Sequence, residues 1–223
     1  MLTSQQKHVL DKNGYIFLPE FLPNLDIVSC GKLFGEIIPP HSIKNEYPAE
    51  KLTPKEKKEF NKNTYSSIFG LGEFPYHTDL AHLPTPPKYL LLRCLKGAKD
   101  VKTKILESKN IIKEYDFSKL KRSIFKPRDK LNSRVSLPLP LIFGNEFIRW
   151  DSIFLQPANK NAEDFHEWMS IALWDGIEKS HSLSVSGDTL LINNWKNLHS
   201  RSSVSEEDRI RVIERIYLSE MWN

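Results

Sequence analysis

Residues 76–79 read Tyr-His-Thr-Asp and carry the pair of side chains around which the rest of the sequence is organised. In a β-strand, residues i and i+2 point to the same face, so His77 and Asp79 would present an imidazole and a carboxylate side by side. One more histidine on a neighbouring strand would complete a 2-His-1-carboxylate facial triad, which holds Fe(II) on one face and leaves the other positions open. On its own, His-x-Asp is a weak signal, because a strand or a turn can carry it by chance.

A second histidine of the right kind lies far along the chain, in the stretch GDTLLINNWKNLHSR at 187–201. A strand is predicted to end at Asn193-Asn194, a turn follows, and His199 emerges just beyond it. Ligands so distant in sequence are usual when two adjacent strands of a closed sheet come from distant parts of the chain. The alternative is structural: His77 and Asp79 would belong to a capped turn, and His199 would be a packed loop histidine.

Arginines are concentrated in the last predicted strand, residues 209–218 (RIRVIERIYL). Burying a row of arginines is costly without an anionic partner, and a bound dicarboxylate would provide one through bidentate hydrogen bonds. Which arginine would anchor it depends on the strand register and stays open. With a period of two, one face of the strand carries Arg209, Arg211, Ile213, Arg215 and Tyr217.

Taken together, these parts resemble the taurine dioxygenase and clavaminate synthase-like branch of the Fe(II)/2-oxoglutarate oxygenases. The resemblance covers the chain from about Gly14 to Leu218, and the order of the parts is more specific than any single part. It implies a mainly β (α+β) fold, with a double-stranded β-helix (a cupin-like jelly-roll core) and flanking helices. The parts are, in order, the His-x-Asp motif, Thr103, a Gly-Asp-x-Leu-x-x-x-Asn segment at 187–194, His199, and an Arg-x-x-x-Arg pair at 211 and 215.

The resemblance also implies roles for individual residues. His77, Asp79 and His199 match the iron ligands. Arg211 matches the arginine that forms a salt bridge with the far carboxylate of 2-oxoglutarate, and Thr103 matches a threonine that hydrogen-bonds the same carboxylate. The positions expected to contact or line the substrate site are Arg215, His82 and Asn194, although a structural turn explains Asn194 equally well.

The chemistry implied by the resemblance uses Fe(II), 2-oxoglutarate and O2. Hydroxylation of an unactivated C–H bond would accompany the release of succinate and CO2. The substrate expected is a small, carboxylate-bearing metabolite, such as an amino acid or a natural-product intermediate; desaturation or cyclisation is a further possible outcome. The alternatives are a sulfonate or sulfate-ester dioxygenase of the taurine dioxygenase type, and a non-catalytic cupin-like binding or sensor protein.

Composition limits the other possibilities. The 223 residues are 39% hydrophobic, enough for one core, so residues 1–223 are predicted to form one domain. Lys and Arg number 32 against 28 Asp and Glu, an excess too small to indicate nucleic-acid binding. Cys30 and Cys94 are too far apart in sequence to suggest a zinc site. Without a signal peptide or an apolar span, the expectation is a soluble cytoplasmic protein with a small-molecule partner, no nucleic acid and no membrane; oligomeric state is not predicted.

Periodicity gives a coarse element list. A lysine-rich stretch at 45–62 could hold a short surface helix, although a solvated loop explains its charges better, and residues 41–66 are a possible lid over the site. His166, in the clearest helix, is assigned no chemistry. Strands are predicted at 14–22, 89–95, 101–105, 136–143, 147–151, 182–193 and 209–218, and helices at 26–38, within 107–132, and at 162–178.

Overall fold

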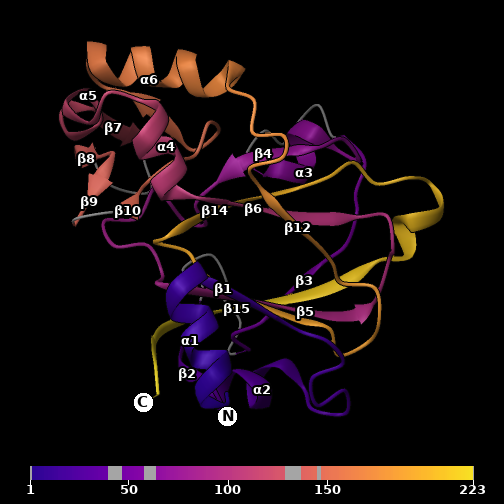
Figure 1. The fold of residues 1–223 in the computed structure, drawn as a ribbon. Helices are drawn as coiled ribbons and strands as arrows, with labels where there is room; N and C mark the ends of the chain where they lie inside the picture. The colour runs from indigo at the N-terminus through magenta and orange to yellow at the C-terminus, as the bar shows by residue number, and fades with distance from the viewer. Residues whose placement is uncertain (1, 40–46, 58–63, 129–136, 145–146, 223) are drawn as a thin grey trace.

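Antiparallel sheets make up most of the protein, with helices on their outer faces (Figure 1). The computed structural model describes residues 2–39, 47–57, 64–128, 137–144 and 147–222. The predicted mainly β fold with flanking helices is therefore confirmed at the level of sheets and helices.

The larger sheet is organised around β5 (Tyr89–Lys96), the continuous apolar run that the sequence predicts as a central strand. Each of its two neighbours in the sheet is antiparallel to it. The order in the sheet is β1 (Tyr15–Leu18), β13 (Thr189–Asn193), β5, β15 (Val212–Met221) and β2 (Gly35–Ile38), with β3 (Glu50–Leu52) also pairing with β15.

The smaller sheet has four strands and faces the larger one (Figure 1). Its order is β12 (Lys179–Ser182), β6 (Lys102–Glu107), β14 (Asn197–Arg201) and β4 (Phe74–His77). The space between the sheets is filled from both sides, because Ile105 of β6 packs in one buried cluster with Leu90 and Leu92 of β5.

The outer face of the larger sheet is covered by α1 (Ser4–Asn13) and α2 (Ile27–Lys32). Successive residues of a strand point to opposite faces, so Leu91 of β5 points away from its neighbours Leu90 and Leu92. Leu91 packs with Leu10 of α1 and Ile27 of α2. The apolar run of β5 is thus explained by burial on both faces.

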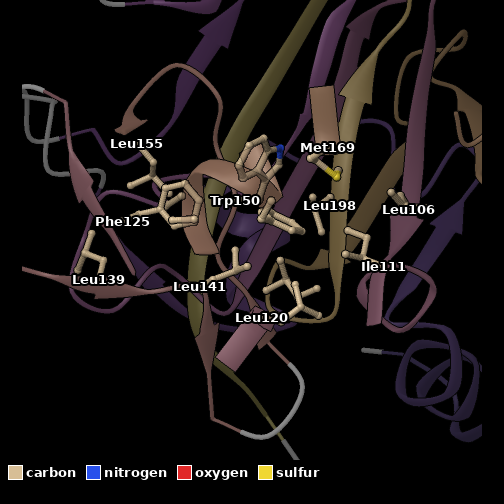
Figure 2. Close-up of a cluster of buried hydrophobic side chains, with 14 of the residues drawn as sticks. Leu106, Ile111, Leu120, Phe125, Leu139, Leu141, Trp150, Leu155, Met169 and Leu198 are labelled. Atoms are coloured by element: carbon tan, nitrogen blue, oxygen red, sulfur yellow. The ribbon is translucent and has the colours of Figure 1, made fainter. Parts of the chain in front are cut away.

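A second layer covers the outer face of the smaller sheet, where Leu106 and Leu198 join a large apolar cluster (Figure 2). Trp150 and Phe125 lie edge to face near its centre, with ring centroids 5.9 Å apart. The layer consists of α4 (Ser108–Glu114), α5 (Phe117–Arg122), α6 (Lys160–Ile171), a sheet of β7 (Ile124–Pro127), β8 (Leu139–Pro140) and β11 (Leu155–Pro157), and the pair β9 (Ile142–Phe143) and β10 (Phe147–Ile148).

The predicted helix at 26–38 is wrong in its second half. Asp26 caps α2, accepting hydrogen bonds from the amides of Val28 and Ser29, but the helix ends at Lys32. Residues 35–38 form β2 and pair with the end of β15. Gly35 allows this pairing, because a Cβ there would lie 1.8 Å from the Glu220 carbonyl oxygen.

Other predicted boundaries also shift. The helix predicted at 162–178 is α6 and ends at Ile171, since the chain turns at Ala172 to bury Trp174 against Trp168. The strand predicted at 182–193 is divided between β12 and β13, in different sheets. Within 45–62, the described residues form β3 without a helix, and the rest lie outside the described residues. The described helices include none long and apolar enough to cross a membrane.

Arg93 ties the larger sheet to the segment between β1 and α2. Its side chain is fully buried and donates to the carbonyl oxygens of Phe21 at 2.7 Å and Leu25 at 3.0 Å, and to the Thr189 hydroxyl at 2.8 Å. A buried guanidinium is tolerated where its donors are satisfied in this way.

We therefore expect Arg93→Met to destabilise the protein by about 3 kcal/mol, because it leaves several buried acceptors without donors. Urea unfolding followed by circular dichroism measures the change. Arg122→Met, at an exposed position of α5, is the matched control and should stay within about 0.5 kcal/mol of wild type. Equal effects of the two substitutions would contradict a structural role for Arg93.

Candidate metal centre

Three buried side chains meet between the two sheets. His77 ends β4, and its direct cross-strand partner in β14 is His199. Asp79 lies two residues beyond the strand, and its Oδ1 is 3.3 Å from His77 Nε2 and 3.6 Å from His199 Nε2. One ligand atom from each residue lies within 4.8 Å of the other two, as a shared metal ion requires. The structure thus brings together the three residues that the sequence picks out as ligands.

The backbone at Asp79 is fixed by Asn194. The Asp79 amide donates to Asn194 Oδ1 at 2.9 Å, and Asn194 Nδ2 donates to the Asp79 carbonyl at 3.0 Å and to the Pro87 carbonyl at 2.9 Å. Asn194 is completely buried. This differs from its expected place in the substrate site, since its amide is occupied in holding the chain at Asp79.

Arg149 fixes the loop that follows Asp79. It is buried, and it donates to the carbonyl oxygens of Ala81 at 2.6 Å and Pro84 at 2.8 Å, and also to that of Leu83. Leu80, inside this loop, has a left-handed backbone (φ +55°) that costs energy for a residue with a branched side chain. Nothing in the sequence around Arg149 indicates this role, because its partners lie about 65 residues earlier in the chain.

The His77 ring is oriented for metal binding through Nε2. Its Nδ1 lies 2.9 Å from the Pro75 carbonyl oxygen. A carbonyl only accepts, so the proton sits on Nδ1 and the lone pair on Nε2 faces Asp79. Tyr65, in α3 (Tyr65–Phe69), stacks on this ring with centroids 4.2 Å apart. His199 Nδ1 is buried and has no hydrogen-bond partner in the described part of the chain.

The second oxygen of Asp79 is held by the larger sheet. Oδ2 accepts from Arg215 Nη1 at 3.0 Å and from the Tyr217 hydroxyl at 3.1 Å. Burial alone would raise the pKa of Asp79, but the charge of Arg215 and the two imidazoles outweigh it and hold that pKa well below its usual range. Asp79 is therefore an ionised carboxylate in the interior of the protein.

The two imidazoles titrate differently. Burial lowers the pKa of His77, but hydrogen bonding and charge from Asp79 outweigh burial and leave it raised. The pKa of His199 is lowered, first by burial and then by the charge on His77. The two rings are therefore not both in the imidazolium form near neutral pH, and any proton on His77 Nε2 must leave before a metal ion binds there.

Thr103 and Arg211 are both buried, and Arg211 lies close enough to Arg201 of β14 and Cys94 of β5 for their charges to interact. Thr103 lies on β6 opposite Arg201 of β14, on the face that carries His199. Arg211 is 6% exposed, burial lowers its pKa to about 10, and no described residue hydrogen-bonds its guanidinium. Arg201, by contrast, is occupied, donating to the carbonyls of Gly70 at 3.0 Å and Gly72 at 2.6 Å. Arg211 is thus a buried cation on which the charge of Asp208 acts, but whose guanidinium has no hydrogen-bonded acceptor among the described residues.

The remaining predicted positions are more peripheral. Arg209 is not on the strand but in a 3₁₀ turn at Glu207–Ile210, where it forms ion pairs with Glu56 and Glu206. Arg209 is therefore not a candidate to bind a dicarboxylate in the interior. The His82 ring lies 5.7 Å from that of Phe154 and does not belong to the group of three ligands.

Glu50 is a site residue that the sequence does not indicate. It lies in β3, directly opposite Arg215 of β15, and its Oε2 accepts from Arg215 Nε at 3.0 Å and from Nη2. It belongs to the stretch 41–66 predicted as a lid, of which 41–46 and 58–63 lie outside the described residues. The described part is a strand paired with the wall of the site.

No protein-family model and no curated protein sequence matches this chain. Among solved structures, it is similar to asparagine oxygenase in complex with Fe(II), 2S,3S-3-hydroxyasparagine and succinate (TM-score 0.71, 15% identity, 96% of this chain and 77% of that chain). It is also similar to the non-heme iron oxygenase OrfP in complex with Fe and alpha-ketoglutaric acid (TM-score 0.68, 17% identity, 97% of this chain and 78% of that chain). A third similar structure is that of PvcB from Pseudomonas aeruginosa (TM-score 0.67, 17% identity, 97% of this chain and 80% of that chain). At such identities, the similarity establishes a shared fold.

Replacing any one of His77, Asp79 and His199 with alanine should weaken Mn(II) binding by at least about 100-fold. This is more than the loss of a residue that only hydrogen-bonds to a ligand causes. Mn(II) is a redox-stable probe, and calorimetric titration measures its affinity. Affinity should also fall as pH is lowered, because protons compete for His77. His8→Ala, at an exposed position of α1, is the control; ligand variants that bind like it would contradict the site.

Proposed function

We propose that the protein is an Fe(II)- and 2-oxoglutarate-dependent dioxygenase that hydroxylates a C–H bond of a small molecule. The observation that carries the proposal is the buried group of His77, Asp79 and His199, together with Arg211, a buried cation with no hydrogen-bond partner among the described residues. Two imidazoles and one carboxylate suit Fe(II) and leave coordination positions open.

The buried side chains of the site suit both an iron ion and 2-oxoglutarate. Both Nε2 atoms and Asp79 Oδ1 would hold the iron. Arg211 would pair with the distal carboxylate of 2-oxoglutarate, with the Thr103 hydroxyl as a second donor, since charge-assisted bonds to a buried arginine are strong. Bound iron supplies the reaction of O2 with 2-oxoglutarate, which yields succinate and CO2 and delivers an oxygen atom to the substrate.

The arrangement of the two sheets also supports the oxygenase assignment. We infer that the two facing sheets are the walls of a double-stranded β-helix, a cupin-like jelly roll. His77 and His199 lie at neighbouring positions of the smaller sheet, and Arg215 and Tyr217 reach Asp79 from the larger one. Such a barrel holds the reacting groups on rigid strands and keeps bulk water away from them.

The charges around Asp79 bear on the substrate class, and they centre on Arg215 and Glu50. These opposite charges lie next to each other and beside the carboxylate of Asp79, and both are about four-fifths buried. Because Arg215 is paired with both carboxylates, this side of the site would favour a substrate that carries an ammonium group, such as an α-amino acid, over a purely anionic one. The asparagine oxygenase structure holds 2S,3S-3-hydroxyasparagine, and one OrfP structure holds (3S)-hydroxy-L-Arg, which supports an amino-acid substrate.

The activity is tested by succinate formation. Wild type supplied with Fe(II), 2-oxoglutarate and O2 should form succinate slowly without substrate, and the correct L-amino acid should raise the rate and gain a hydroxyl group detectable by mass spectrometry. His77→Ala should form none, while His8→Ala should match wild type. Absence of succinate from wild type would favour a non-catalytic binding protein, and sulfite release from simple sulfonates would favour the sulfonate dioxygenase.

The anchor for 2-oxoglutarate is tested with Arg211→Met. Loss of a charge-assisted pair worth about 1.5–3 kcal/mol should weaken 2-oxoglutarate binding to the Mn(II)-loaded protein about 10- to 100-fold, with Mn(II) affinity unchanged. Arg209→Met is the matched control, because Arg209 makes only exposed ion pairs. An equal effect of both substitutions, or none from either, would contradict Arg211 as the anchor.

A further inference from the structure

The two carboxylate oxygens of Asp79 have different surroundings. Oδ1 faces His77 Nε2 at 3.3 Å and His199 Nε2 at 3.6 Å. Oδ2 faces the larger sheet and accepts two hydrogen bonds, from Arg215 Nη1 at 3.0 Å and from the Tyr217 hydroxyl at 3.1 Å. One oxygen is thus available to a metal ion, and the other is already occupied by donors of the protein.

Both donors are held firmly. Arg215 and Tyr217 are two residues apart on β15 and share its inner face. Both lie in the part of the strand that is paired with β5. Tyr217 is 1% exposed. Arg215 is in turn braced by Glu50, which accepts from Nε and Nη2 and leaves Nη1 for Asp79. These contacts favour the observed orientation of the carboxylate.

The Tyr217 hydroxyl acts as a donor in this arrangement. An ionised carboxylate only accepts, so the phenol must supply the proton of the bond. A tyrosine hydroxyl is ordinarily protonated at neutral pH, so it can donate here. Rotation of Asp79 to bring Oδ2 toward the imidazoles would break two charge-assisted bonds in a buried site.

We propose that Tyr217, together with Arg215, is a positioning residue that restricts Asp79 to binding metal through Oδ1 alone; the proposal rests on the metal site proposed above. The consequence concerns the open coordination positions. Of the six positions around an octahedral ion, a one-oxygen Asp79 and two histidines occupy three. A two-oxygen Asp79 would occupy four and leave two, too few for a chelating 2-oxo acid and O2 together.

The test compares Tyr217→Phe with Tyr89→Phe. Tyr89 is also a buried strand tyrosine, but it lies on the outer face of β5, away from Asp79. Tyr217→Phe should weaken Mn(II) binding by about tenfold, as is usual for loss of an outer-shell partner of a metal ligand, and should change the Mn(II) electron paramagnetic resonance spectrum. Tyr89→Phe should leave both unchanged.

The outcomes separate this proposal from the proposed function. If wild type does not bind Mn(II), the metal site itself is wrong. If wild type binds Mn(II) but both phenylalanine variants match it in affinity and spectrum, the positioning role of Tyr217 is wrong. Should Tyr217→Phe fail to fold, a crystal structure of the wild-type protein with Mn(II) decides: one bonded Asp79 oxygen supports the proposal, and two bonded oxygens overturn it.

Discussion

A buried ion pair between Asp79 and Arg215 joins the two facing sheets, and the geometry of the site depends on it. Asp79 follows β4 of the smaller sheet, and Arg215 lies on β15 of the larger one. Burying two charges is costly unless the remaining hydrogen-bonding atoms are satisfied. Here Tyr217, Glu50 and the two imidazoles complete the contacts of the pair. The same interactions keep the carboxylate ionised and facing the histidines, as a metal ligand must be.

Four arginines in the interior or at its edge differ in their hydrogen-bond partners. Arg93 and Arg149 are fully buried, and backbone carbonyls receive most of their hydrogen bonds. Arg215 is matched by the carboxylates of Asp79 and Glu50. Arg211 alone of these four has no hydrogen-bond partner among the described residues. Burying a guanidinium without hydrogen-bonded acceptors is costly, and this contrast is why we propose Arg211, rather than the other three, as the anchor of 2-oxoglutarate.

Much of this arrangement could be predicted from the sequence, because it depends on local periodicity and on the order of the motifs. The period of two correctly places Arg215 and Tyr217 on the inner face of β15. The same period fails at Arg209, because a 3₁₀ turn and an irregularity between Val212 and Ile213 interrupt the strand. The roles of Glu50, Asn194 and Arg149 could not be predicted, since each arises from contacts with residues 65 to 165 positions away.

The most direct test of the central assignment is an anaerobic titration followed by visible absorption. A 2-oxo acid that chelates Fe(II) produces a charge-transfer band that neither component gives alone. Wild type should develop this band only when both Fe(II) and 2-oxoglutarate are present, with a stoichiometry of one each per chain. Failure of the band to appear in wild type, or its persistence in Asp79→Ala, would contradict a metal centre built from His77, Asp79 and His199.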